Sequence, residues 1–184
     1  MDAASLPDDL QKAVAFHGHL CPGLVIGYRA AKAAAAALGV GQSEDEELVA
    51  LVENNSCSVD AFQALLSTTF GKGNLKWLDF GKQAFTLMDR GRGRAVRVVF
   101  VGDGLKRPGP DGGTDREAFM QALLAAPADQ VVRVEPVDAP PPPEARIEPS
   151  LICACCGEGV QASRTVTTYS GETYCLPCAQ REAV

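Results

Sequence analysis

The chain has 184 residues, a net charge of −6 and 46% hydrophobic residues, which suits one medium-sized domain and a smaller module. The acidic balance argues against a nucleic-acid-binding protein, because affinity for phosphate backbones comes mainly from Lys and Arg. No apolar run is long enough to span a bilayer, and the N-terminus opens with an acidic residue and no basic region. We therefore expect a globular protein of the cytoplasm that does not bind membranes.

Helices and strands alternate along the first three quarters of the chain. Pro22 is placed to start the longest helix, since its missing N–H needs no partner there, and Gly39 is placed to end it. A serine cap and Asp60 in the first turn favour a helix after Cys57. The alternation indicates an α+β domain with a mixed sheet. The expected helices are 7–16, 22–38, 59–66 and 115–125, and the expected strands are 47–53, 74–78, 83–88, 95–101 and 130–136.

The composition changes at residues 139–143, which read Ala-Pro-Pro-Pro-Pro. Four consecutive prolines favour an extended polyproline II conformation and cannot lie inside a helix or a central strand. We therefore predict an N-terminal domain over residues 1–138, a proline-rich linker over 139–150 and a small module over 151–184. The module is too short to fold by apolar burial alone.

This C-terminal module carries two Cys-x2-Cys pairs, Cys153 with Cys156 and Cys175 with Cys178. Two pairs with this spacing predict a structural Zn²⁺ site with four thiolate ligands and no open position. A β-hairpin is expected between the pairs. Cys155 is the surplus thiol, because using it would lose the two-residue spacing. The module has no basic stripe, so docking to a protein is favoured over docking to nucleic acid.

Both histidines of the chain lie beside a cysteine, as His17, His19 and Cys21. Alternate residues of an extended loop project to one side, so these three side chains would face one point. Cys21 and Cys57 each precede a predicted helix, whose dipole favours a thiolate. If the two helix N-termini converge, the four residues predict a transition-metal site with a position open for substrate.

Two alternatives to this metal site remain open. Without a metal, Cys21 or Cys57 beside a histidine such as His19 would form a catalytic thiol–imidazole pair. In the other alternative, the histidines are satisfied within their loop and the cysteines are buried and inert. Asp60 would orient a ligand or cap its own helix. Lys72 would bind an anion or stand solvated in a hairpin turn.

Four segments occur in a characteristic order: 16–23 (Phe-His-Gly-His-Leu-Cys-Pro-Gly), 57–63 (Cys-Ser-Val-Asp-Ala-Phe-Gln), 70–75 (Phe-Gly-Lys-Gly-Asn-Leu) and 79–82 (Asp-Phe-Gly-Lys). Together with the four-cysteine finger they resemble the FmdE family of formylmethanofuran dehydrogenase proteins over nearly the whole chain. The resemblance implies a thioredoxin-like domain with a mixed five-stranded sheet flanked by helices. It also implies a treble-clef-like zinc finger and a homodimer.

The resemblance also implies roles for particular residues. The implied ligands of zinc or another transition metal in the N-terminal domain are His17, His19, Cys21 and Cys57. The residues implied to line the pocket and contact a cofactor are Asp60, Gln63, Lys72 and Asn74. One position departs from the family, because Thr68 stands where a further cysteine is expected. A mechanism that needs a third thiol is therefore disfavoured, and metal binding is not.

Three functions follow from these observations. The first is a metal-binding protein auxiliary to a molybdenum or tungsten formylmethanofuran or formate dehydrogenase-type system, with the oxidoreductase subunits as partners. The second is a thiol-based sulfur-transfer or redox protein. The third is a non-enzymatic adaptor that docks through its zinc finger.

Overall fold

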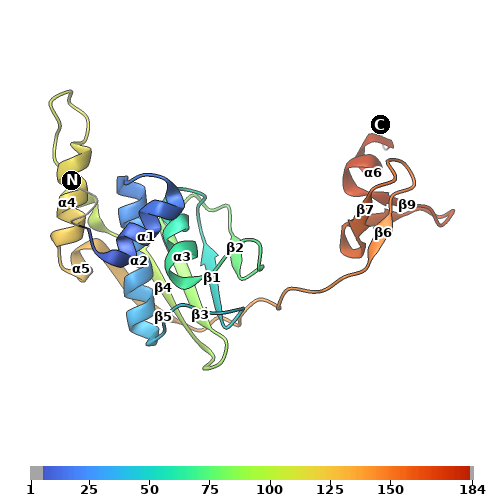
Figure 1. Ribbon diagram of the computed structural model, residues 1–184, viewed down its shortest axis with the longest axis horizontal. Helices are drawn as coiled ribbons and strands as arrows, with labels where there is room; N and C mark the ends of the chain where they lie inside the picture. The colour runs from blue at the N-terminus through green and yellow to red at the C-terminus, as the bar shows by residue number, and fades with distance from the viewer. Residues whose placement is uncertain (1–5, 183–184) are drawn as a thin grey trace. The chain divides into compact units, whose positions relative to one another are not determined.

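The computed structural model describes residues 6–182, and the chain divides into two compact units, Met1–Glu144 and Ala145–Val184. The first unit contains every helix and strand expected from its sequence, and two short helices besides (Figure 1). Its elements are α1 (Asp8–His17), α2 (Pro22–Leu38), β1 (Leu48–Val52), α3 (Ser58–Leu66), β2 (Leu75–Trp77), β3 (Ala84–Asp89), β4 (Arg94–Phe100), η2 (Gly102–Leu105), α4 (Arg116–Ala125), α5 (Ala128–Val131) and β5 (Val132–Val137).

The five strands form one sheet in the order β2-β1-β3-β4-β5. β1 and β2 are parallel, and the other three pairs are antiparallel. The predicted α+β fold with a mixed five-stranded sheet flanked by helices is thus confirmed. Helices α1, α2 and α3 lie over the same face of the sheet in Figure 1. The main core lies beneath them, where Phe62 of α3 stacks on Phe85 of β3 with ring centroids 4.7 Å apart.

Two glycines on one side of α2 allow α3 to approach closely. A Cβ added at Gly27 would lie 2.1 Å from the main-chain oxygen of Ser58, and one added at Gly23 would lie 3.1 Å from the Cβ of Cys57. Only a residue without a side chain permits the contact at position 27, where the obstructing atoms are main chain, and at position 23 a side chain would be tight against Cys57. The N-terminus of α3 therefore lies directly against the first turns of α2, which brings Cys57 towards Cys21.

Two local predictions in this region are wrong. No side chain caps α3: Cys57 occupies the N-cap position, and the hydroxyl of Ser58 instead bonds the side chains of Asn54 and Gln83. His17 is not in an extended loop. It is the last residue of α1, which Gly18 ends with a left-handed φ of 95°.

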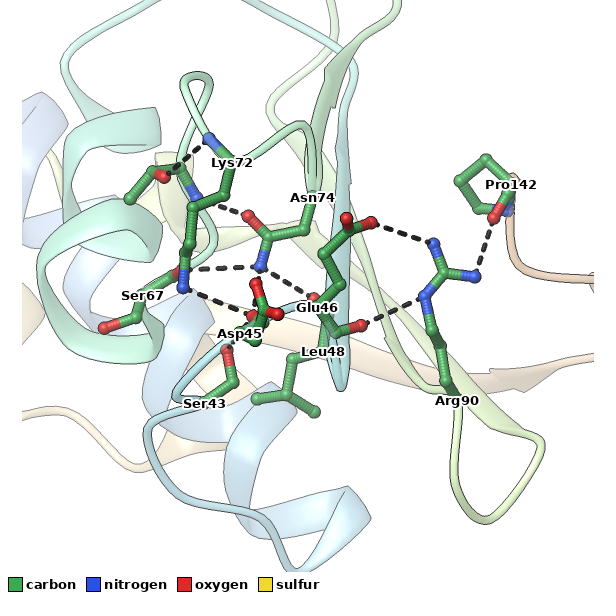
Figure 2. Close-up of polar contacts among 10 residues, drawn as sticks. Ser43, Asp45, Glu46, Leu48, Ser67, Lys72, Asn74, Arg90 and Pro142 are labelled. Carbon is green, nitrogen blue, oxygen red and sulfur yellow. Dashed lines mark hydrogen bonds and ion pairs between the residues drawn. The ribbon is translucent and has the colours of Figure 1, made fainter. Parts of the chain in front are cut away.

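The proline-rich segment begins on the surface of the first unit. Ala139 packs against the cluster of Val49, Met88 and Ala95. Further along, Arg90 donates hydrogen bonds to the main-chain oxygens of Glu46 and Pro142 (Figure 2). Residues 139–144, which we predicted as the start of a linker, therefore lie with the first unit.

The second unit is a pair of small hairpins with one helix. β6 (Ser150–Ile152) pairs with β7 (Gly159–Gln161), and after η3 (Ala162–Arg164) the expected hairpin forms between β8 (Thr165–Thr167) and β9 (Thr173–Cys175). The chain continues into α6 (Leu176–Glu182). Among the helices of residues 6–182, none has the length and apolarity required to cross a bilayer.

Candidate metal centre

Three side chains from three elements meet in the first unit. His17 ends α1, Cys21 is the N-cap of α2 and Cys57 is the N-cap of α3, and one ligand atom from each lies within 4.8 Å of the others. Cys21 is 4% exposed and its sulfur accepts a hydrogen bond from the main-chain N–H of Leu24 at 3.4 Å. Cys57 is partly exposed, and no capping hydrogen bond holds its sulfur. The group can hold a metal ion.

A carboxylate fixes the imidazole of His17. Its Nδ1 lies 2.6 Å from Oδ2 of Asp60, and its Nε2 lies 3.7 Å from the sulfur of Cys21. The other carboxylate oxygen accepts a hydrogen bond from the side-chain amide of Gln63 at 3.2 Å. In the neutral imidazole, donation from Nδ1 to the carboxylate leaves the lone pair of Nε2 on the side of the Cys21 sulfur. This is the arrangement in which proteins hold metal-binding histidines.

The roles of Asp60 and Gln63 follow from these contacts. Sequence reasoning considered two roles for Asp60, orienting a ligand or capping its own helix, and the structure places its side chain against His17. Gln63 in turn holds Asp60. Neither residue belongs to the group of three ligand atoms, so both act on the site through His17.

His19 lies outside this group of ligand atoms. Its side chain is exposed, and its ring centroid lies 4.6 Å from that of His17, with the planes inclined at 35°. The expectation that His17, His19 and Cys21 project to one side assumed an extended loop, whereas α1 continues to His17. The structure therefore assembles three of the four predicted N-terminal ligands and leaves the imidazole of His19 beside them.

Lys72 and Asn74, expected to contact a cofactor, make other contacts in the structure. The ammonium of Lys72 donates to the main-chain oxygen of Asp45 at 3.2 Å. The side-chain nitrogen of the fully buried Asn74 donates to the main-chain oxygens of Asp45 and Leu48, and its oxygen accepts from the N–H of Thr69 (Figure 2). The two side chains thus tie the turn after α3 to the loop before β1.

The thiol of Cys57 does not have the low pKa that its position before a helix predicted. Burial raises its pKa, and the hydrogen bond and charge of the neighbouring Cys21 raise it further. Both effects disfavour a thiolate at Cys57 unless a cation is bound nearby. The three-residue group is thus better suited to a metal than to an exposed metal-free nucleophile.

Comparison with known proteins decides the family. A family model described as "FmdE, Molybdenum formylmethanofuran dehydrogenase operon" matches residues 16–133. The chain belongs to the FmdE family. The matched region includes all three ligand residues of the N-terminal site and excludes the C-terminal unit.

Two of the proteins that are similar to this FmdE-family chain are informative. One is a solved tungsten formylmethanofuran dehydrogenase FmdE-like protein from Syntrophus aciditrophicus, with 25% identity and a TM-score of 0.71, where the match covers 100% of this chain and 97% of that one. The other is a probable S-adenosyl-L-methionine-binding protein from Archaeoglobus fulgidus, 30% identical over 92% of this chain. The chain spans 52% of the length of that curated relative.

The FmdE chain has a second group of possible ligands in its C-terminal unit. The sulfurs of Cys153, Cys156, Cys175 and Cys178 lie within 4.8 Å of one another, and Cys155 is not among them. Main-chain N–H groups, first those of Cys156 and Cys175, lower the pKa of Cys153 to about 6. Gly157 supports the tight turn with a φ of 73°. This four-thiol group also can hold a metal ion.

Gly23 and Gly27, which allow the close approach of the two cysteines, are not among the functional residues predicted from the sequence. Neither offers a ligand atom, but a Cβ at position 27 would displace the main chain at the N-terminus of α3, and one at position 23 would press on the side chain of Cys57. Their spacing of four residues, which places both on one side of a helix, was the available signal.

Proposed function

We propose that this FmdE-family protein holds a zinc ion in its N-terminal domain through His17, Cys21 and Cys57, with one coordination position open to a small ligand. The observation that carries the proposal is the bond between Asp60 and His17, because it aims Nε2 at the two sulfurs. Two thiolates and an imidazole suit zinc, and three protein ligands are typical of catalytic zinc sites. When bound, the metal would supply a Lewis acid at that position.

His19 supports the proposal that a reaction takes place at the open coordination position of the N-terminal metal. It is exposed, lies against the ring of His17 and is not one of the three grouped ligands. Imidazole is the side chain whose proton exchange falls near neutral pH. We assign His19 to proton transfer at the open position, while Cys21 and Cys57 hold the metal.

The four-thiol group in the second unit has a different task in this proposal. Zinc there would be enclosed by Cys153, Cys156, Cys175 and Cys178 and would stabilise a unit of about 40 residues that lacks a sizeable core. This zinc would be structural. The unit would serve as a docking element, as its net acidic charge favours a protein over nucleic acid.

We further propose that the protein assists a molybdenum or tungsten dehydrogenase. The support is the family description and the name of the Syntrophus aciditrophicus protein. S-adenosyl-L-methionine, for which the Archaeoglobus fulgidus relative is named, is a second ligand to test, since this chain spans about half of that protein. Copurification of the full chain with such a dehydrogenase tests the auxiliary role.

Metal analysis of the full chain tests the N-terminal site. Zinc-loaded wild type should contain two metal ions per chain, one for each ligand group. The variant Cys21→Ser/Cys57→Ser should retain one, and the control Cys155→Ser, which changes an exposed thiol outside both groups, should retain two. One metal per chain in the zinc-loaded wild type would refute the proposal.

Cobalt substitution tests the open position. An added small thiol should change the thiolate-to-cobalt absorption of the wild type, because it can occupy the fourth position. The change should vanish in Cys21→Ser/Cys57→Ser, in which only the closed four-thiol site remains. A change that persists in that variant would assign the open position to the finger and contradict the proposal.

A metal-free thiol enzyme is the second candidate function. The line of contacts from Asp60 through His17 to Cys21 favours it, because a carboxylate, an imidazole and a thiol in this order also activate nucleophilic cysteines. Alkylation of the metal-free protein separates the two. A Cys21 that reacts at the rate of a free thiol throughout the neutral pH range would exclude this candidate.

A further inference from the structure

Cys21 and Cys57 are close enough to react with each other. Their sulfurs lie within 4.8 Å, and a disulfide bond needs about 2.05 Å, so the sulfurs must approach by less than about 3 Å. Residue 23, which lies beside both sulfurs, is glycine, and a Cβ there would lie 3.8 Å from the sulfur of Cys57 and 4.0 Å from that of Cys21.

The two thiols differ in how firmly they are held. The sulfur of Cys21 is buried and accepts a hydrogen bond from the N–H of Leu24. The sulfur of Cys57 has no capping hydrogen bond and its residue is partly exposed. Cys57 is therefore the more exposed residue of the pair, while the sulfur of Cys21 is held in place beside it.

We propose that Cys21 and Cys57 form a reversible disulfide when the protein meets a peroxide, and that this bond and the N-terminal metal compete for the same two sulfurs. Hydrogen peroxide first oxidises one thiol of the pair to a sulfenic acid and is itself reduced to one water. The sulfur of the other cysteine then displaces the hydroxyl of that sulfenic acid, which leaves with the second thiol's proton as another water. Two thiols are oxidised and one peroxide is reduced.

The consequence for the metal follows from the ligand count. The disulfide removes two of the three ligand atoms and leaves only the imidazole of His17, so the N-terminal metal is released. The four thiols of the second unit are not part of this disulfide, so the metal of the second unit should stay bound. The competition half of this proposal rests on the proposed function, whereas formation of the disulfide in metal-free protein does not.

Peroxide treatment of the full chain tests the disulfide. In metal-free wild type the four thiols of the second unit can oxidise as well, so the diagnostic result is a peptide map that joins the peptides containing Cys21 and Cys57. Cys155→Ser should give the same joined peptide, and Cys57→Ser should not. A folded wild type in which Cys57 oxidises onward to sulfinic acid with no joined peptide would overturn the proposal.

Zinc protection tests the competition. At free zinc about 100 times the dissociation constant, about 1% of the pairs is metal-free, so the joined peptide should form about a hundredfold more slowly. Reduction with dithiothreitol should restore metal binding. An N-terminal site that binds zinc but oxidises at the metal-free rate would overturn the competition. If the peptides of Cys21 and Cys57 are joined in a protein that binds no zinc at the N-terminal site, the disulfide is supported and the proposed function is refuted.

Discussion

Replacing Gly27 by alanine should disturb the metal centre without touching a ligand. The added Cβ would lie 2.1 Å from the oxygen and 2.6 Å from the Cα of Ser58, where real Cβ contacts do not fall below 3.0 Å. The obstructing atoms are main chain and cannot rotate away. The N-terminus of α3, and Cys57 with it, must therefore move from α2 by about 0.9 Å or more, the difference between 3.0 and 2.1 Å.

This displacement is large for a metal site and moderate for a protein core. Metal–ligand distances tolerate about 0.2 Å, so moving one of three ligands by about four times that amount should weaken zinc binding about a hundredfold or more. For stability, overpacking costs about 1–3 kcal/mol, and removing a glycine from a helix returns about 0.5–1 kcal/mol. We expect a net loss of at most about 2.5 kcal/mol.

Competition with a chelator and urea unfolding measure the two effects on the same protein. Gly41→Ala is the matched control, because its φ is not positive and a Cβ there meets nothing within 4 Å. The control should bind two metals with wild-type affinity. A Gly27→Ala protein whose N-terminal metal is held as tightly as in wild type would refute the claim that this contact sets the site.

Three further predictions concern the same groups. Asp60→Asn keeps the shape but gives up the charge that orients His17, so N-terminal metal affinity should fall about 10–100-fold in a chelator titration while the metal of the second unit stays. Alkylation of Cys57 in metal-free protein should begin at higher pH than in a free thiol. Because the pKa of Cys57 is higher in the folded than in the unfolded protein, the free energy of unfolding of the metal-free form should fall as the pH rises from the unfolded to the folded pKa. At lower pH this thiol should leave the free energy of unfolding unchanged. Alkylation of Cys57 at the pH of a free thiol would contradict the late alkylation and the loss of stability alike. Removing metal with a chelator should abolish the amide protection of residues 150–182 in hydrogen exchange and leave that of the sheet unchanged, and protection that survives in both would contradict a structural metal in the second unit.

The sequence predicted the larger elements because their signals are local. Pro22 and Gly39 mark the ends of α2 with the residue types that a helix start and end require. The strands of the sheet were found from their apolar runs. The elements that were missed, such as η2, α5 and the β6–β7 hairpin, have three or four residues each, too few to show a hydrophobic period.

The metal centre was predictable only in part, because it depends on one contact between residues close in the sequence and on another between residues far apart in it. His17 and Cys21 are four residues apart, so their proximity is a local matter. That Cys57 joins them is decided by the packing of α3 on α2 at Gly23 and Gly27; the spacing of these glycines marks a side of α2 open to close approach but does not say which element packs there. His19 was misplaced for a local reason, since the helix before the loop ends one residue later than expected, at His17.

Position 68, where the family resemblance places a further cysteine, holds a threonine with a structural contact. Thr68 is fully buried and its hydroxyl donates to the main-chain oxygen of Phe62 in α3. Among the described residues, Cys21 is the cysteine whose sulfur is grouped with that of Cys57, within 4.8 Å. Cys57 can therefore share a metal ion or a bond with Cys21 without a third thiol.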